Sequence, residues 1–211
     1  LSRIIILQTS ICFGRISKRM PWIVLTLGKK RIKMLDKILA DCSTEWSKTK
    51  TNKKHPYRYF YLATVDKEGL PEVRTVVLRK FDPKQLLFTI YTDARTPKIT
   101  SLIALPFAEL LFYDARKLTQ LRVRAKCIEQ SKDEVAFSQQ HENAQKDYTT
   151  NIAPGQPIKS MDEVTYLEEN HFVKLVFKAE KIDFLKLMRP NHQRAIFEFK
   201  DDQWKGKFVT P

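Results

Sequence analysis

The spacing of hydrophobic residues changes from a helical period to a strand period near residue 55. Between Lys30 and Lys48, apolar residues recur every three or four positions among lysines and acids, which predicts one amphipathic helix. Short runs rich in β-branched and aromatic residues, bounded by turn residues, follow from residue 57 and predict a sheet. The apolar stripe of the predicted helix consists of Ile32, Leu35, Ile38, Leu39 and Trp46.

The predicted strands form three groups along the chain. The runs YRYFYLATV, PEVRTVVLRKF and QLLFTIYT predict an antiparallel meander. FAELLFYDA and LTQLRVRAKCIEQ predict two more strands, and in the second Leu121, Val123, Ala125 and Cys127 share one face, which indicates a half-buried strand. FVKLVFKAEKIDFLKLM, AIFEFKD and WKGKFVT predict a closing set. With about seven strands, the pattern predicts an α+β, mainly β, fold: a small β-barrel with short peripheral helices.

Three short helices are predicted between the strands. Thr96 followed by Pro97 is typical of a helix N-cap with proline at the first helical position, and KITSLIAL supplies about two turns. SKDEVAFSQQ combines a serine cap with early acids, which also favours a helix. MDEVTYLEEN predicts the third.

The net charge of +14 is concentrated near the beginning of the chain. Residues 1–33 carry eight Lys/Arg and no acid, residues 36–54 carry five Lys/Arg against three acids, and the rest is only about +4. We therefore predict a basic N-terminal arm, residues 1–29, and one domain, residues 30–211. The acid-free segment 1–19 is interpreted either as a mitochondrial-type presequence or as a stretch upstream of a true start at Met20, with an ordered arm as a third reading.

Scattered cysteines and histidines exclude some classes of site. Cys12, Cys42 and Cys127 are widely separated and odd in number, so we expect neither a disulfide framework nor a bound metal. This usage of cysteine is typical of a reducing compartment. No apolar run reaches the roughly 18 residues that a membrane span needs. We expect a cytoplasmic protein, or a mitochondrial one if residues 1–19 are a presequence.

The five glycines are all isolated, which excludes a glycine-rich phosphate loop. Any bound phosphate must therefore be held by side chains and helix N-termini. YTDARTPK, residues 91–98, places Arg95 and Lys98 at a predicted helix start, and Arg74 lies on a neighbouring predicted strand. Cations beside a helix N-terminus make a phosphate site. No residue stands out as a general base, so the catalytic residues stay unassigned.

Three motifs carry a resemblance to a known family. RTVVLR (74–79), YTDARTPK (91–98) and TQLRV (119–123) resemble, in this order and spacing, the FMN-binding motifs of the pyridoxamine 5'-phosphate oxidase-related split-barrel family. The resemblance covers roughly residues 56–211 and is closer to the broad oxidase-related branch than to the biosynthetic enzyme. It implies an FMN-binding split β-barrel and a homodimer with the flavin site at the subunit interface.

The resemblance also implies roles for individual residues. Arg74 and Lys98 would hold the FMN phosphate, with Arg95 nearby. The strand from Arg74 to Arg79 would lie along the isoalloxazine ring, with Gln120 at a ring edge. Arg194, and with it Gln156 and Trp204, would come from the partner subunit. The cofactor-binding set is thus Arg74, Thr75, Val76, Val77, Arg79, Tyr91, Thr92, Arg95, Lys98, Gln120 and Arg194.

The chain departs from the biosynthetic enzyme where that enzyme binds its substrate's phosphate. A register on Phe137 places Ala136, Gln140 and Ala144 at the family's Tyr, Arg and Ser, and Pro190 replaces an arginine. We expect an FMN-dependent oxidoreductase acting on an unidentified small substrate. One alternative is a genuine pyridoxamine or pyridoxine 5'-phosphate oxidase with an altered pocket. Another is a non-catalytic flavin- or anion-binding module whose basic arm binds nucleic acid. Nucleic acid is a disfavoured partner, because the cations of the body are not interleaved with exposed aromatic residues.

Overall fold

The computed structural model describes residues 20–211, and side chains from residue 30 onward. The presequence and alternative-start interpretations, and most of the predicted basic arm, lie outside the described residues. The chain divides into two compact units, Leu1–Met34 and Leu35–Pro211. In the first unit the structure describes the beginning of one helix, and all the strands described below residue by residue belong to the second.

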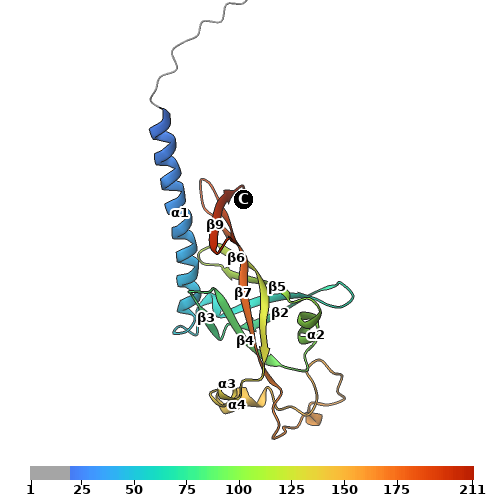
Figure 1. Ribbon diagram of the computed structural model, residues 1–211. Coiled ribbons are helices and arrows are strands. Elements are labelled where there is room, and N and C mark those ends of the chain that lie inside the picture. Colours follow the sequence, from blue (N-terminus) through green and yellow to red (C-terminus); the bar gives the residue numbers. More distant parts are fainter. Residues whose placement is uncertain (1–19) are drawn as a thin grey trace, which may run out of the picture. The chain divides into compact units, whose positions relative to one another are not determined.

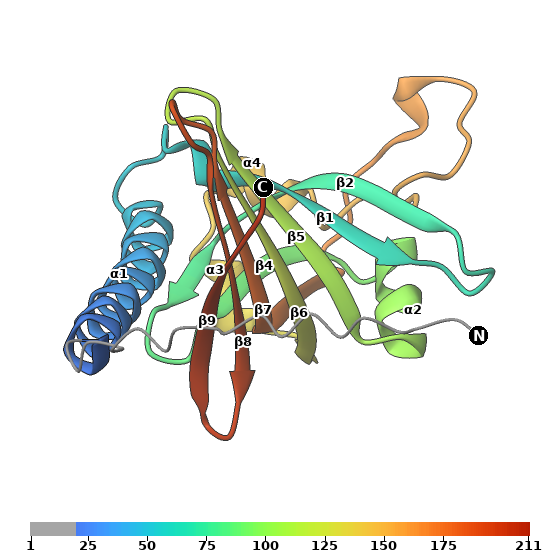
Figure 2. The same ribbon diagram turned by 90° about the horizontal axis from the view of Figure 1, so that it is seen from above.

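The described chain contains nine strands and four α-helices (Figures 1 and 2). The helices are α1 (Met20–Lys48), α2 (Pro97–Ala104), α3 (Glu134–Ser138) and α4 (Glu142–Lys146), with short 3-10 turns at Pro56–Arg58 and Met161–Glu163. The strands are β1 (Tyr59–Val65), β2 (Pro71–Val77), β3 (Lys80–Asp82), β4 (Leu87–Asp93), β5 (Phe107–Asp114), β6 (Thr119–Ser131), β7 (Phe172–Lys186), β8 (Gln193–Lys200) and β9 (Gln203–Val209).

All paired strands are antiparallel, in the order β2-β1-β5-β6-β7-β4-β3, and in addition β8 pairs with β7 and β9 pairs with β8. The mainly β fold with short helices is confirmed, and so are the predicted α2, α3 and the strands β5 to β9. The expected meander is confirmed as two antiparallel pairs, β1 with β2 and β3 with β4. It is wrong as three consecutive neighbouring strands, because the predicted middle strand divides into β2 and β3, which lie at opposite ends of the order.

A change of hydrogen-bonding partner at Leu78 and Arg79 explains this error. The Leu78 amide donates to the carbonyl of Arg58, before β1, whereas the next amide, Arg79, donates to Thr89 in β4. The segment therefore stops pairing with β1 and begins to pair with β4 within two residues. In this way the continuous run PEVRTVVLRKF supplies strands at both edges of the split barrel. Local periodicity does not report such a switch, because both halves alternate normally.

The core lies between α1 and the inner face of the sheet. Leu35, Ile38, Cys42 and Trp46 form the buried stripe of α1, with Cys42 in a position that the sequence analysis did not assign to it. The Trp46 ring packs on Phe88 at 5.0 Å and on Phe112 at 5.6 Å. Clusters of this kind supply most of the burial that stabilises a small barrel.

Three predictions about the helices are wrong. Helix α1 begins at Met20, ten residues before the predicted start. Ile32, expected in the apolar stripe, is 61% exposed. MDEVTYLEEN forms only the 3-10 turn Met161–Glu163 and then irregular chain, because a single bridge from Thr150 to Tyr166 and backbone bonds to the 149–151 segment replace a helix there.

Candidate cofactor-binding site

The turn from β4 into α2 is built around the nearly buried Asp93. Its carboxylate accepts hydrogen bonds from the Arg95 backbone amide at 2.8 Å and from the Arg95 guanidinium at 2.7 and 3.1 Å. The same guanidinium donates to the Thr150 carbonyl at 2.8 Å. Arg95 therefore ties the turn to a distant loop, and the Asp93 carboxylate compensates its charge. Of the two cations in YTDARTPK, Arg95 therefore has a structural role.

Lys98, in the first turn of α2, forms no ion pair with a carboxylate of the described residues. Its ammonium donates to Thr92 Oγ1 at 2.9 Å. Burial, followed by the positive charge of Arg74, lowers the pKa of Lys98 to about 8. A lysine whose pKa is lowered in this way sits where positive charge is costly and a negative partner would be favourable. The structure thus brings Lys98 and Arg74, which are 24 residues apart in the sequence, into one electrostatic environment.

Arg74 reaches this environment from the inner face of β2. Its guanidinium donates to Thr64 Oγ1 at 2.7 Å and pairs with Glu72 at 2.7 Å. Glu72 is half-buried and lies on the same strand, so it compensates Arg74 only in part. Neither Thr64 nor Glu72 was predicted. The alternation of β2 places Glu72 beside Arg74 on one face, but nothing in the sequence identifies Thr64 on β1.

The first turn of α2 completes this cluster. Thr96 occupies the N-cap position as predicted, but its hydroxyl donates to the Asp93 carbonyl at 2.8 Å and makes no capping bond. The amides at the start of α2 therefore keep their preference for an anion. Thr92 Oγ1 and Thr96 Oγ1 lie 3.4 Å apart, beside Lys98. We call Arg74, Thr92, Thr96 and Lys98 the inner cluster.

A second group surrounds Arg79, which lies beyond the end of β2. Its guanidinium carbon is 5.6 Å from the centre of the Tyr91 ring. The Tyr91 ring packs on Phe172 at 4.7 Å, and Tyr148 packs on Phe172 at 5.0 Å. Burial raises the pKa of Tyr148, against the opposing effect of Arg79. Arg79 therefore belongs to an aromatic group formed by β4, β7 and the chain after α4.

The remaining predicted residues on β2 divide between the two faces. Val76 packs against the core on the same side as Arg74. Thr75 and Val77 point to the outer face, where they oppose Tyr61 and Tyr59. The structure therefore does not bring all predicted residues of this strand together within one chain.

Gln120 and Arg194 lie on the outer face, in one row of paired residues through Leu185. The Arg194 guanidinium bonds Asp183 at 2.8 and 3.0 Å, and Arg122 bonds the same carboxylate at 2.7 Å. Asp183 is 4% exposed, and these arginines hold its pKa below the ordinary value against the effect of burial. We call Arg122, Asp183 and Arg194 the outer cluster. Asp183 was not predicted, although an acid among the apolar residues of IDFL was a usable signal.

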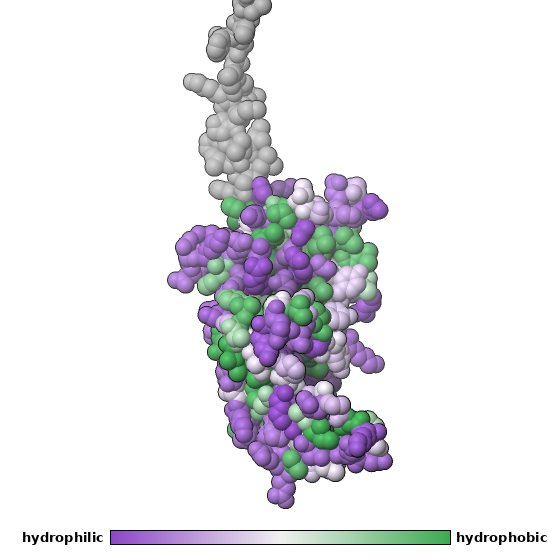
Figure 3. Space-filling model, turned by 90° about the vertical axis from the view of Figure 1, so that its right-hand side faces the viewer, coloured by the Kyte–Doolittle hydropathy of each residue, from purple (hydrophilic) through white to green (hydrophobic). Residues whose placement is uncertain are grey.

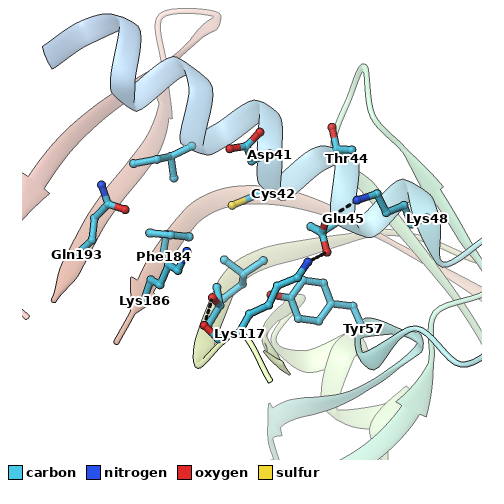
Figure 4. A pocket seen from close by; sticks show the side chains of 13 residues that line it. Asp41, Cys42, Thr44, Glu45, Lys48, Tyr57, Lys117, Phe184, Lys186 and Gln193 are labelled. Carbon is cyan, nitrogen blue, oxygen red and sulfur yellow. Dashed lines mark hydrogen bonds and ion pairs between the residues drawn. The ribbon is translucent and has the colours of Figure 1, made fainter. Parts of the chain in front are cut away.

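Another cavity, of about 390 Å³, opens between α1 and the ends of β6, β7 and β8 (Figure 4). Glu45 lies within it between Lys48 and Lys117, which lower the pKa of the carboxyl to about 2 against the effect of burial. Cys42 faces the same space, but burial raises the pKa of its thiol to about 12, so it stays protonated at neutral pH. Among the described residues, no cluster of His, Cys, Asp and Glu could hold a metal ion.

Residues 41–129 match the family model described as the FMN-binding domain of pyridoxamine 5'-phosphate oxidase. Pyridoxine/pyridoxamine 5'-phosphate oxidase 2 of Arabidopsis thaliana is 29% identical over 176 residues, which cover 72% of this chain and 87% of the plant protein. The match to the pyridoxine/pyridoxamine 5'-phosphate oxidase of Bartonella henselae is 40% identical but covers only 30% of each protein.

Two solved structures share the fold. One is a pyridoxamine 5'-phosphate oxidase-related, FMN-binding protein from Nostoc punctiforme, with a TM-score of 0.65 and 22% identity over 78% of this chain and 94% of that one. The other is PhzG from Burkholderia lata, with a TM-score of 0.63 and 15% identity over 85% and 92%. The chain is therefore similar to the pyridoxamine 5'-phosphate oxidase-related FMN-binding proteins and has their split-barrel fold. The match to an FMN-binding domain supports FMN as the cofactor.

Proposed function

We propose that this protein is an FMN-dependent oxidoreductase and that the inner cluster holds the FMN phosphate. The observation that carries the proposal is the pair Arg74 and Lys98, whose like charges share a half-buried space beside the uncapped start of α2. A phosphate dianion would offset that repulsion and accept hydrogen bonds from both side chains. The residues present thus fit the phosphate end of FMN. Bound FMN supplies hydride or electron transfer, which no side chain provides.

Within this proposal the chain's residues bind and orient the cofactor. Thr92 and the first amides of α2 would complete the phosphate contacts that Arg74 and Lys98 begin. Arg95 would act indirectly, because its bonds to Asp93 and Thr150 fix the turn that presents Lys98. Arg79, over the Tyr91 ring, is left for the ring end of the cofactor or for the substrate.

We propose further that the site is completed in a homodimer. Gln120 and Arg194 face outward, whereas Arg74 faces inward, so one chain does not present them to the same ligand. The outer face of β1, β2 and β5 exposes Tyr59, Tyr61, Val73 and Tyr113, and aromatic residues are enriched at protein interfaces. On the face shown in Figure 3, apolar and polar side chains are interspersed. Light scattering of the purified protein measures the assembly.

Reconstitution with FMN tests the function. The protein incubated with FMN and desalted should keep a flavin absorbance band. In Arg74→Ala/Lys98→Ala, the loss of two charge-assisted hydrogen bonds should weaken FMN affinity by at least about 100-fold. Lys67→Ala/Arg116→Ala removes the same charge at exposed positions and should bind like the parent protein. Unchanged affinity in the first variant would overturn the phosphate assignment, and a colourless desalted parent would overturn the function.

Oxidation of pyridoxine or pyridoxamine 5'-phosphate is the second candidate, favoured by the plant relative's name and its match over 72% of this chain. The region of Ala136 and Gln140 argues against it, because α3 and α4 are separate short helices and the Gln140 amide is used on the Ala136 carbonyl. Peroxide release by the FMN-loaded protein on adding either compound would establish this activity.

A further inference from the structure

A basic hollow of about 720 Å³ lies on the outer face where β6 and β7 reach β8. It is separate from the residues proposed for FMN. Two carboxylates, Glu180 and Glu198, are outnumbered by the five cations Arg124, Lys126, Lys178, Lys181 and Lys200. The excess of three positive charges favours a ligand with more than one negative charge.

The cations of the basic hollow oppose one another across two strands. Arg124 pairs with Lys181, and Lys126 pairs with Lys178, in the ladder between β6 and β7. Like charges at directly opposite positions destabilise a sheet. Two such pairs in close succession lower the stability of the sheet. Solvent screens this repulsion only in part, and a bound anion would offset it.

Available carboxylates leave this charge only partly compensated. Glu198 is engaged by Lys181 at 3.6 Å and by Lys200 at 2.6 Å. Arg124 has only Glu109, at 3.9 Å. In the part of the chain that the structure describes, Lys126 and Lys178 have no carboxylate partner. The two unpaired ammonium groups lie on one cross-strand pair.

Two β-bulges shape the hollow. The register shifts between Arg124 and Ala125, where Glu180 is the extra residue of β7, and between Cys127 and Glu129, where Ile128 is the extra residue of β6. Both extra residues line the hollow. Bulges bend a strand and redirect its side chains, and they are frequent beside binding sites. Here they turn Glu180 and Lys181 outward together while Ala179 and Ile182 stay buried.

An aromatic ring stands beside the unpaired cations. Phe199 is 37% exposed, and the Lys178 ammonium is 5.6 Å from its centre. Trp204 packs against the same ring at 5.6 Å and supports it. The sequence pattern disfavours nucleic acid as a partner because it shows no exposed aromatic residues interleaved with the cations of the body, but Phe199 places an exposed ring beside these cations. Cations next to a supported aromatic ring are the elements with which proteins bind nucleotides by stacking.

We propose that the basic hollow binds a nucleotide, with the phosphate groups on Lys126, Lys178 and Arg124 and the base against Phe199. The same chemistry is presented by a free nucleoside triphosphate and by single-stranded nucleic acid.

Fluorescence anisotropy of the FMN-loaded full chain with labelled single-stranded oligothymidylate, with unlabelled ATP as competitor, tests the proposal. Binding should saturate. In Lys126→Gln/Lys178→Gln it should fall about tenfold or more at low salt, and the slope of log affinity against log salt should lose about 1.4 for two phosphate contacts. Displacement of the oligomer by ATP identifies a free nucleotide as a ligand, and its absence identifies the nucleic acid strand.

Matched variants separate a site from general basicity. Lys67→Gln/Lys84→Gln removes the same charge at exposed positions outside the hollow and should leave binding unchanged. Phe199→Leu should weaken the thymidylate oligomer but not an abasic one. The melting temperature of Lys126→Gln/Lys178→Gln should not fall, since a repulsive pair is removed. The proposal is overturned if the oligomer does not bind, if both double variants lose the same affinity, or if Lys126→Gln/Lys178→Gln binds like the parent.

Discussion

The inner and outer clusters each bring two cations of distant sequence position together, yet they differ in what lies between those cations. In the outer cluster the nearly buried Asp183 accepts three hydrogen bonds from Arg122 and Arg194. In the inner cluster Glu72 pairs with Arg74 from the same strand, but no carboxylate among the described residues forms an ion pair with Lys98, and the pKa of Lys98 falls to about 8. A cation that is paired with a buried carboxylate stabilises the fold, whereas a cation without such a partner is available to bind an anionic ligand. A count of cations in the sequence does not distinguish the two.

Removal of the central carboxylate should have the largest effect. Asp183→Ala leaves two arginines facing each other without their shared partner. The loss should be about 2–3 kcal/mol of the free energy of unfolding, below the cost of leaving a fully buried charge, because both arginines keep contact with solvent. Urea unfolding of apo-protein measures this loss. Glu72→Ala, which removes the half-buried carboxylate beside Arg74, should cost no more than about 1 kcal/mol. Equal losses in the two variants would contradict the distinction between the clusters.

The pH dependence of FMN binding sharpens the comparison next. The folded-state pKa of Lys98, about 8, lies below its ordinary value of 10.5, so the free protein loses this proton as pH rises through 8. A bound phosphate favours the charged amine, and binding above that pH must take up a proton. FMN affinity should therefore fall by up to about tenfold per pH unit above pH 8. Titrations between pH 7 and 9 measure it, with Lys98→Arg as a control that should stay nearly flat.

The lowered pKa of Lys98 also means that this residue reduces the stability of the apo-protein. Because the pKa of Lys98 is lower in the folded state, the unfolded chain binds more protons than the folded chain between pH 8 and 10.5. The free energy of unfolding therefore increases with pH across this window, and the contribution of Lys98 to it is least favourable below pH 8. Lys98→Met should raise the apo melting temperature at pH 7 by a few degrees. Arg95→Ala, three residues earlier, should lower it because Asp93 loses its partner. A lower melting temperature in Lys98→Met would contradict this account.

The smallest expected effect is at Thr92. Thr92→Val keeps the shape of the side chain but removes the hydroxyl that accepts a hydrogen bond from Lys98. A hydrogen bond to a charged group contributes about 1.5 kcal/mol at the low end, so FMN affinity should fall about tenfold. Isothermal titration measures the change, with Thr75→Val on the outer face as the matched control. A loss in the control as large as in Thr92→Val would place Thr75 in the same contact.

Much of the fold was predictable because it depends on local patterns. The alternation of Leu121 and Val123 with charged residues identified β6, and the Thr96-Pro97 pair located the start of α2. The strand order was not predictable, because the switch at Leu78 and Arg79 depends on which distant carbonyls their amides meet. The MDEVTYLEEN prediction failed for a similar reason, since bonds to the 149–151 segment outweigh a weak helical preference.

The candidate site was predictable in its residue types and less so in their roles. Arg74 and Lys98 follow from the motif resemblance, and the structure brings their charges together. Arg95 and Lys98 look equivalent in YTDARTPK, but their difference depends on Asp93 and Thr150. Asp93 is two residues from Arg95 in the sequence, whereas Thr150 is 55 residues away, which is why sequence alone could not separate the roles of Arg95 and Lys98.

The strand order also sets when the proposed phosphate site can exist during synthesis. The β1–β2 hairpin that carries Arg74 is local and can form early, but β4, which leads into α2, depends on its long ladder with β7, at residues 172–186. Contacts between such distant segments form late in folding. We therefore expect a nascent chain to present the two cations separately before they come together, so that only a nearly complete polypeptide would capture the cofactor.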